Sequence, residues 1–181
     1  MSELEDIIAQ CKAENPVAQE RLFRLYAPKM LGVCRRYLTS VDDARDAMQE
    51  GFVKVFLNIH KYEGRSSFNT WITRIMMNAS LDLIKKISKV TFVRDDYFYK
   101  EEEKFAKDYF VDPGLNERQL LMVIDKLPNG YKLVFNMHVI DGLNHREIAQ
   151  ALNISEGTSK SQLARARAIL KTEIKKLQAA I

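Results

Sequence analysis

The sequence contains few of the residues that build disulfide frameworks and tight turns, with two cysteines, four prolines and seven glycines. Its two cysteines, Cys11 and Cys34, fit no metal spacing and no disulfide pattern, so we expect two buried thiols in a reducing compartment. Glycine is scarce, with seven in 181 residues, and no run alternates apolar and polar side chains as a strand does. No apolar run approaches the ~20 residues that cross a bilayer, and the acidic start is unlike a signal peptide. These absences predict a cytoplasmic, helical protein.

Charge is distributed unevenly along the chain. The composition, 46% hydrophobic and 29% charged, is typical of a soluble globular protein. Residues 1–90 carry 14 basic and 11 acidic side chains, residues 91–117 carry 4 and 8, and residues 118–181 carry 10 and 5. Two mildly basic blocks therefore flank an acidic connector, which favours a chain that meets a polyanion at both ends.

The hydrophobic pattern is helical nearly throughout. Apolar residues recur at helical spacing over about 2–13, 16–37, 40–60 and 68–88, and again over about 116–126, 128–141 and 144–177. Residues 91–115 lose this periodicity and hold the turn signal Asp112-Pro113-Gly114. We predict an all-α fold: two small helical domains, 1–90 and 116–181, joined by a flexible acidic linker over 91–115.

Residues 144–171 have the pattern of a helix-turn-helix, the motif that lays its second helix in the DNA major groove. Asn144 and Glu147 have capping-box spacing at the start of a short first helix. Asn153 suits the left-handed residue that ends this helix. Ser155 suits the N-cap of a second, longer helix. The C-terminal domain is therefore predicted to bind DNA.

The second helix of this motif has two distinct sides when it is unrolled at ~100° per residue. Its predicted core stripe is Leu163, Ala166, Leu170, Ile174 and Leu177. The opposite side mixes cations with small residues, as close approach to phosphates and base edges requires: Lys160, Ser161, Ala164, Arg165, Arg167, Ala168 and Lys171. The alternative is an amphipathic helix with a solvated basic face.

The helix over 40–60 carries carboxylates among apolar side chains on the side away from its predicted core. This side holds Asp42, Asp46, Gln49, Glu50, Val53 and Leu57. Such a mixture suits a surface that docks a partner helix bearing cations and apolar groups. The alternative is an ordinary acidic face that favours the helix N-terminus.

The helix over 68–88 has aromatic, amide and cationic residues along one edge. They are Trp71, Arg74, Asn78, Asp82 and Lys85, and the preceding loop adds Tyr62 and Arg65. Stacking on aromatic rings and hydrogen bonding to base edges are the means by which proteins bind single-stranded bases. The alternative is that Trp71 belongs to the core.

Taken in order, these segments resemble an extracytoplasmic-function sigma factor, a small two-domain member of the sigma-70 family. The matching segments are residues 43–52, 68–82, 127–128, 147–149 and 157–167. Each motif alone is weak, but the ordered set at this length is specific. The resemblance covers both domains and omits the linker, so it implies that 1–90 is sigma region 2 and 116–181 is sigma region 4.

The resemblance implies a role for each matching position. Clamp helices of the largest polymerase subunit would meet Asp43, Asp46, Gln49, Glu50 and Phe52. The minus-ten promoter element would be melted and read by the 61–67 loop and the following helix, with Tyr62, Arg65, Trp71, Arg74, Asn78 and Lys85. The minus-thirty-five element would meet Lys160, Ser161, Gln162, Ala164 and Arg165.

The resemblance also implies promoter-specific transcription initiation with core RNA polymerase and promoter DNA as partners. It implies no catalysis, no cofactor and no metal, and it adds an anti-sigma factor as a further partner. Three positions depart from the family pattern. Ser159 stands where an aliphatic residue is usual, and we expect its hydroxyl to bond to a carbonyl one turn back. Asn153 replaces a common glycine, which asparagine tolerates, and Ala164 replaces a frequently larger residue.

Two other classes of function compete with that of a sigma factor. A stand-alone helix-turn-helix regulator would usually dimerise to read a palindrome, but the chain shows no heptad seam and its N-terminal block would lack a purpose. An enzyme could use the carboxylates at 42, 43, 46 and 50 to hold a metal. No histidine, cysteine or glycine-rich phosphate loop accompanies them, which disfavours that class.

Overall fold

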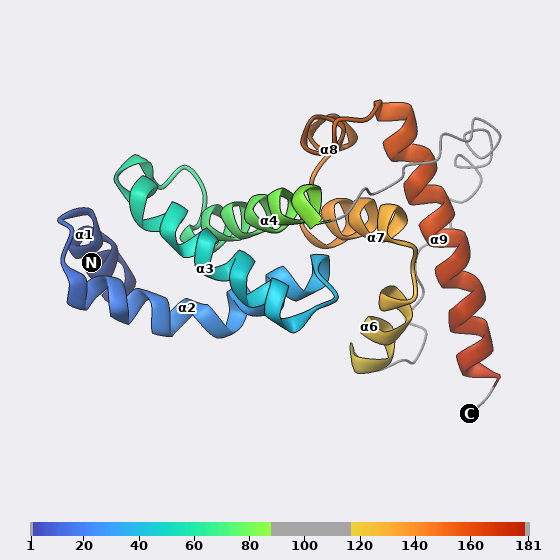
Figure 1. The fold of residues 1–181 in the computed structure, drawn as a ribbon, viewed down its shortest axis with the longest axis horizontal. Helices are drawn as coiled ribbons and strands as arrows, with labels where there is room; N and C mark the ends of the chain where they lie inside the picture. Colours follow the sequence, from blue (N-terminus) through green and yellow to red (C-terminus); the bar gives the residue numbers. More distant parts are fainter. Residues whose placement is uncertain (1, 88–116, 180–181) are drawn as a thin grey trace. The chain divides into compact units, whose positions relative to one another are not determined.

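The computed structural model describes residues 2–87 and 117–179, and these residues form an all-α fold (Figure 1). The chain divides into two compact units, Met1–Lys89 and Val90–Ile181, each described here by itself. The first unit holds α1 (Glu3–Lys12), α2 (Pro16–Tyr37), α3 (Val41–Asn58), the 3-10 helix η1 (Ile59–Lys61) and α4 (Phe68–Ile87). The second holds α6 (Glu117–Asp125), α7 (Asn129–Phe135), the π-helix η3 (Asn136–Ile140), α8 (His145–Leu152) and α9 (Glu156–Gln178). The all-α prediction is confirmed, whereas the predicted linker over 91–115 lies outside the described residues.

Side-chain caps set the start of the first three helices. Ser2 and Glu5 form a reciprocal capping box at α1. Asn15 accepts hydrogen bonds at the start of α2, where Pro16 occupies the first helical position and lacks an N–H that would need a partner. Ser40 accepts from the backbone N–H of Asp43 at α3. The predicted helix starts are therefore explained by local hydrogen bonding.

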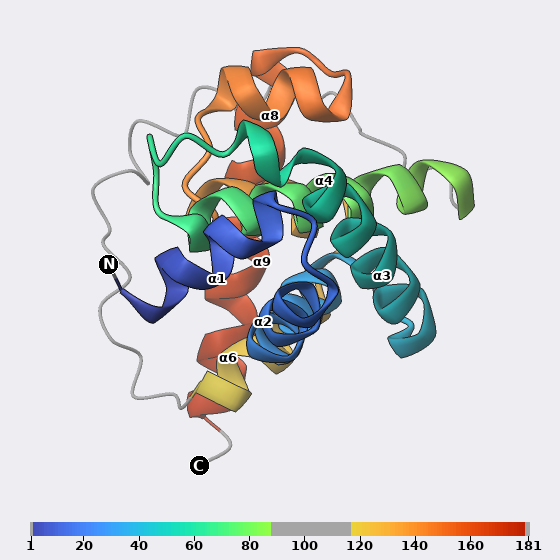
Figure 2. The same cartoon turned by 90° about the vertical axis from the view of Figure 1, so that its left-hand side faces the viewer.

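The core of the first unit lies between α2, α3 and α4, and Figure 2 shows α2 nearly end-on with the other three helices around it. Leu22 and Met30 of α2 and Ile72 and Met76 of α4 are fully buried. Gly51 of α3 faces Met76 so closely that an added Cβ would overlap the methionine sulfur. A glycine at this position lets α3 and α4 approach each other.

The second unit contains the predicted helix-turn-helix. Asn144 and Glu147 form the capping box of α8, and Ser155 caps α9. Asn153 is left-handed, with φ 54° and ψ 49°, as predicted for the residue that ends the first helix of the motif. Ile148 of α8 and Leu163 of α9 meet in the buried core of the unit. The helix-turn-helix prediction is confirmed.

The helix predicted over 128–141 is not uniform. It is α-helical to Phe135 and then widens into the π-helix η3, where the N–H of Asp141 donates to the carbonyl of Asn136 at 3.0 Å. Gly142 follows at φ +73°, a conformation that favours glycine, and closes the segment as predicted.

Cys11 and Cys34 are buried free thiols, as predicted. Burial is the main reason that the pKa of each thiol is raised. Across the described ranges, no helix combines the length and apolar character needed to cross a membrane.

Candidate nucleic-acid and partner interfaces

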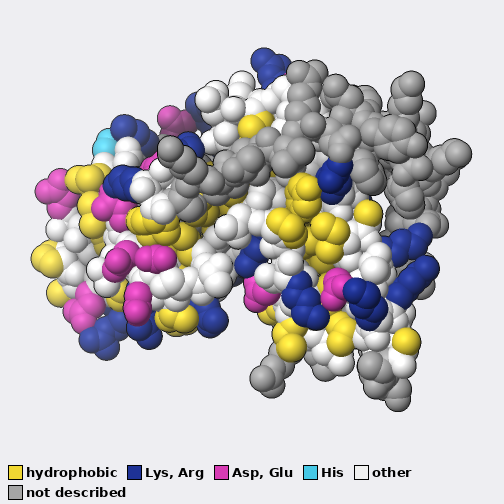
Figure 3. Space-filling view, turned by 45° about the vertical axis from the view of Figure 1, so that its right-hand side comes forward, with side chains coloured by type: hydrophobic (Ala, Val, Ile, Leu, Met, Phe, Trp, Pro, Cys, Tyr) yellow, Lys and Arg dark blue, Asp and Glu magenta, His cyan; other side chains and the backbone are white. Residues whose placement is uncertain are grey.

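The outer face of α3 mixes acidic and apolar side chains, as predicted. Val53 and Leu57 are 53% and 67% exposed, and Asp46, Gln49 and Glu50 are exposed beside them. Figure 3 shows acidic side chains next to hydrophobic ones over the first unit, on the left. Leaving two large apolar side chains in water has no benefit for the isolated fold, so this face has the composition of a docking surface.

A basic residue connects this face to α4. Lys54 lies 3.0 Å from Asp82 of α4 and 3.9 Å from Glu50 one turn earlier in α3. Asp82, which the sequence placed on the base-reading edge, therefore joins the two helices. Asp43 is half-buried near the start of α3.

Phe52 does not belong to this face. It is 3% exposed and packs against Phe23 of α2, with ring centroids 4.7 Å apart. Its side chain packs between α2 and α3, so the structure gives no support to a direct partner contact by Phe52, which stays a prediction. It contributes by holding α3 in place.

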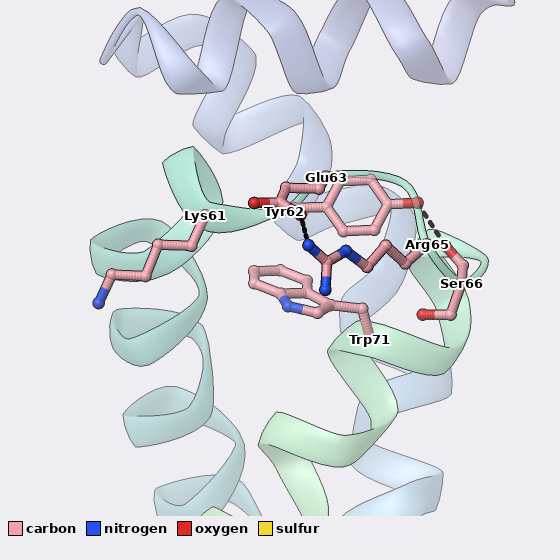
Figure 4. Close-up of a pocket in the computed structure, with 6 residues that line it drawn as sticks. All are labelled: Lys61, Tyr62, Glu63, Arg65, Ser66 and Trp71. Atoms are coloured by element: carbon pink, nitrogen blue, oxygen red, sulfur yellow. Dashed lines mark hydrogen bonds and ion pairs between the residues drawn. The ribbon is translucent and has the colours of Figure 1, made fainter.

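The loop before α4 closes on itself around a small hollow of about 290 Å³ (Figure 4). Tyr62 donates its hydroxyl proton to the carbonyl of Ser66 at 2.8 Å. Arg65 pairs with Glu63 at 2.7 Å, and Trp71 of α4 forms one wall. Its lining residues are Lys61, Tyr62, Glu63, Arg65, Ser66 and Trp71. The structure thus brings together Tyr62, Arg65 and Trp71, which the sequence pattern had assigned to one base-binding edge.

Trp71 is neither fully in the core nor free in solvent. It is half-buried, with its ring centroid 5.4 Å from that of Tyr62 and 5.5 Å from that of Phe68. Phe68 is buried, and its ring centroid lies 5.3 Å from that of Tyr26 of α2. These aromatic contacts fix the indole at the rim of the hollow while leaving part of it accessible.

Arg74, Asn78 and Lys85 are exposed along α4, beyond the hollow. The i, i+4 spacing of Arg74 and Asn78 puts both on one side of the helix. This edge offers an amide and two cations to a neighbouring polyanion, in the arrangement that the sequence predicted.

The first turns of α9 differ from expectation. Ser161, Gln162 and Ala164 are 3%, 0% and 9% exposed, whereas Lys160 and Arg165 are half-buried. Ser161 also donates its hydroxyl proton to the carbonyl of Thr158 at 3.0 Å. Ser161 and Ala164, which periodicity placed away from the core, are therefore buried, as is Gln162; their contact with the minus-thirty-five element stays a prediction.

Arg165 is held from a second helix. Its Nη1 lies 3.4 Å from the hydroxyl oxygen of Tyr131 in α7, a long hydrogen bond across the α7–α9 contact. Tyr131 thereby helps to orient a guanidinium that the sequence selected for DNA contact.

The structure contains a stacked histidine pair, at the helix-turn-helix, that the sequence pattern did not indicate. The rings of His138 in η3 and His145 in α8 stack with centroids 4.5 Å apart and an interplanar angle of 14°. Nδ1 of His145 lies 2.9 Å from the hydroxyl oxygen of Ser159, and Nδ1 of His138 lies 2.8 Å from the carbonyl oxygen of Leu143. Ser159 thus bonds to a side chain of α8, and the expected bond to a carbonyl one turn back is replaced.

The pKa of His145 is lowered to about 4, mainly by burial and to a smaller extent by the neighbouring His138, Lys160 and Arg167. His145 is therefore neutral at pH 7 and available for hydrogen bonding with Ser159. No sequence signal marks the pair, because the partners belong to three different elements.

Metal chemistry finds no support in the part of the chain that the structure describes, where no group of three or more His, Cys, Asp or Glu side chains could hold an ion.

Comparison with known proteins accounts for both units. Residues 22–90 match Sigma-70 region 2, and residues 117–170 match Sigma-70, region 4. The ECF RNA polymerase sigma factor SigW of Bacillus subtilis (strain 168) is 28% identical over 179 residues, covering 94% of this chain and 96% of its own length. A stand-alone regulator is disfavoured, because the first unit matches Sigma-70 region 2.

Two solved structures share the fold. One is CnrH in complex with the cytosolic domain of CnrY, with a TM-score of 0.51 and 20% identity, covering 94% of this chain and 96% of that chain. The other is the sigma factor RpoE in complex with the anti-sigma factor NepR from Bartonella quintana, with a TM-score of 0.52 and 18% identity, covering 87% and 96%. The order of the two matched regions, the helix-turn-helix in the second and the similarity to SigW along nearly the whole chain lead to one conclusion: the chain belongs to the extracytoplasmic-function sigma factors of the sigma-70 family, which direct RNA polymerase to promoters.

Proposed function

We propose that this sigma factor divides promoter recognition between its two units and docks on core polymerase through α3. The observation that carries the proposal is the preformed hollow at Trp71, which adjoins the exposed Arg74–Asn78 edge of α4 within one unit. A site that combines an accessible aromatic wall, cations and an amide suits an unstacked base of the minus-ten element.

Core binding is assigned to the α3 face, through Asp46, Gln49 and Glu50 with the apolar Val53 and Leu57. Carboxylates at the rim would steer a basic partner helix, and the two apolar side chains would be buried on contact. The half-buried Asp43 lies at the edge of this surface. Phe52 supports the face from below.

Minus-ten recognition is assigned to the hollow and the outer edge of α4. One base would stack at the rim of the hollow against Trp71 and Tyr62, while Arg65 and Lys61 neutralise neighbouring phosphates. Arg74, Asn78 and Lys85 would contact the strand along α4. Melting follows because a base held in the hollow is no longer available to its partner strand.

Minus-thirty-five recognition is assigned to the first turns of α9, with Lys160 and Arg165 as the charged contacts. Ser161, Gln162 and Ala164 are covered in the structure, so base contact through them requires that this face become exposed. We infer that assembly with polymerase and DNA changes the surroundings of α9.

The proposal places the protein in the cytoplasm as a factor without catalytic activity of its own, with no cofactor or metal. An anti-sigma factor is a further proposed partner, supported by the two structural relatives, each recorded with a bound partner protein. The mixed acidic and apolar face of α3 would suit such a partner as well as polymerase.

The test is transcription from a cognate promoter with purified core polymerase. Asp46→Arg with Glu50→Arg should abolish core binding and run-off product, because like charges then oppose the basic partner. The matched control, Asp6→Arg with Glu20→Arg, reverses two exposed carboxylates on α1 and α2 and should retain both activities. Wild-type core affinity in the α3 variant, with an unchanged circular dichroism spectrum, would refute the assignment of this face.

A further inference from the structure

A lysine on α1 bonds to the first residue of the loop that forms the hollow. Nζ of Lys12 donates to the backbone carbonyl oxygen of Tyr62 at 2.6 Å and lies 5.9 Å from the centroid of the Tyr62 ring. The two residues are 50 positions apart, and α1 lies before residue 22, where the match to region 2 begins. The contact therefore links a helix outside the matched region to the base-binding loop.

Helix α1 is anchored firmly enough to act as a fixed point. Ile7, Ile8 and Cys11 are buried, so the residue just before Lys12 is held in the core. Arg21 of α2 pairs with Glu3 at 3.1 Å near the other end of α1. Lys12 also lies in the last turn, where a cation is favoured by the helix dipole. The backbone of Lys12, from which its ammonium group extends, is therefore held in a defined position.

The loop has its own internal bonds. The N–H of Tyr62 donates to the carbonyl of Ile59 at 3.1 Å, and the Tyr62 hydroxyl donates to Ser66. Gly64 adopts φ +75° at the turn. These contacts close the loop on itself, whereas the Lys12 bond ties it to another helix. Tyr62 and Trp71 both line the hollow, and their ring centroids are 5.4 Å apart, so a shift of the Tyr62 backbone changes the shape of the hollow (Figure 4).

We propose that Lys12 is a positioning residue for the minus-ten site: it fixes the backbone at Tyr62, sets the spacing between Tyr62 and Trp71, and so sharpens discrimination among bases in the hollow. This inference rests on the proposed function, in which the hollow holds a base. In this proposal Lys12 does not contact the base and acts only through Tyr62.

The substitutions distinguish the effect of the Lys12 hydrogen bond from the effect of the size of its side chain. Lys12→Met keeps the aliphatic stem and removes the donor, whereas Lys12→Arg keeps a donor and should rescue. Arg21→Met is the matched control, because it removes the other polar contact of α1 and leaves the loop untouched. All three replace exposed residues, so circular dichroism and the thermal midpoint should remain close to wild type.

The first readout uses the chain alone. Trp71 is the single tryptophan of the protein, so its fluorescence reports on the hollow directly. Quenching of Trp71 by acrylamide should increase in Lys12→Met and stay at the wild-type level in Lys12→Arg and Arg21→Met. Equal quenching in Lys12→Met and wild type would overturn the proposed link between α1 and the hollow.

The second readout uses holoenzyme and single-stranded minus-ten DNA with each base substituted in turn. Lys12→Met should reduce the ratio between cognate and best non-cognate affinity by roughly 3–10-fold, since a single hydrogen bond contributes about 1 kcal/mol. Trp71→Ala in the same assay tests the hollow itself. If Trp71→Ala abolishes discrimination and Lys12→Met leaves it unchanged, the Lys12 inference fails alone. If Trp71→Ala also leaves it unchanged, the assignment of the hollow fails.

Discussion

The two units present their reading surfaces in different states. In the first, the hollow, the indole of Trp71 and the outer edge of α4 are accessible, and aromatic packing from α2 and the loop holds them in shape. In the second, the small reading positions Ser161, Gln162 and Ala164 of α9 are covered. The residues proposed for minus-ten contact are thus accessible in the structure, whereas three of those proposed for minus-thirty-five contact are buried.

This difference follows from how each site is built. The site in the first unit is built from large side chains on a short loop and one helix. Part of each aromatic ring therefore stays accessible even where the rest of the side chain is packed against its neighbours. The site in the second unit uses small residues along one face of a helix, which any neighbouring element can cover.

The largest effect is expected from crowding the α3–α4 contact. Gly51→Leu should destabilise the first unit by about 1–3 kcal/mol, because the new side chain overlaps Met76. Gly32→Leu in α2 is the matched control, since an added Cβ there meets nothing within 4 Å. Amide exchange resolved along the chain should show lost protection in the first unit and unchanged protection in the second. An equal loss of amide protection in both units would contradict the expectation that the substitution acts within the first unit.

The next effect concerns the accessible aromatic wall. Trp71→Ala should weaken binding of minus-ten single strands by about 1–3 kcal/mol, the range for base stacking on an aromatic residue. Binding of duplex carrying only the minus-thirty-five element should not change. A variant with full minus-ten affinity would place Trp71 among the structural residues, as the alternative interpretation of the sequence holds.

Arg165→Ala tests the covered surface. In holoenzyme it should weaken promoter binding by ~1–3 kcal/mol in a sequence-dependent manner if the guanidinium contacts a base, and uniformly if it contacts phosphate. Tyr131→Phe removes the hydroxyl near Arg165 and should produce a smaller loss of the same kind. Unchanged initiation on every promoter variant would exclude this part of α9 from DNA contact.

The smallest effect is a pH dependence confined to the second unit. His145 is neutral in the folded state with a pKa of about 4, so the unfolded chain binds its proton first as pH falls. Its contribution to stability should be complete above about pH 6.5, the ordinary histidine value, and should decrease as pH falls toward 4. His145→Gln should flatten this slope, whereas His60→Gln, an exposed position in the first unit, should not. An identical slope in all three proteins would contradict the role given to burial.

The parts of the fold that could be predicted are those fixed by neighbours in sequence. The caps at Asn144 and Ser155 and the left-handed Asn153 depend on residues within one turn, and each was predicted correctly. The mixed face of α3 followed from helical periodicity alone. Periodicity put Phe52 on the core side of α3, where the structure buries it, whereas its contact role came from the family resemblance alone and stays a prediction.

The remaining features depend on distant partners and left no local signal. Ser159 bonds to His145, 14 residues away, and Lys12 bonds to Tyr62, 50 residues away. Gln162 is fully buried, which its place in the helical pattern does not indicate. Helical periodicity placed Arg74, Asn78 and Lys85 on an exposed edge of α4, but no local pattern indicates that Ser161 and Ala164 are buried.

We expect the free protein to bind promoter DNA poorly and core polymerase to convert it into a specific binder. The two basic blocks have a small excess of charge, which supports only a few phosphate contacts, and the second reading surface is covered. The direct test is titration of labelled duplex promoter at physiological salt with the full-length chain, alone and with core enzyme. The account predicts weak, salt-sensitive binding alone and tight, sequence-specific binding with core. Tight, sequence-specific binding by the free chain would contradict it and favour a stand-alone regulator.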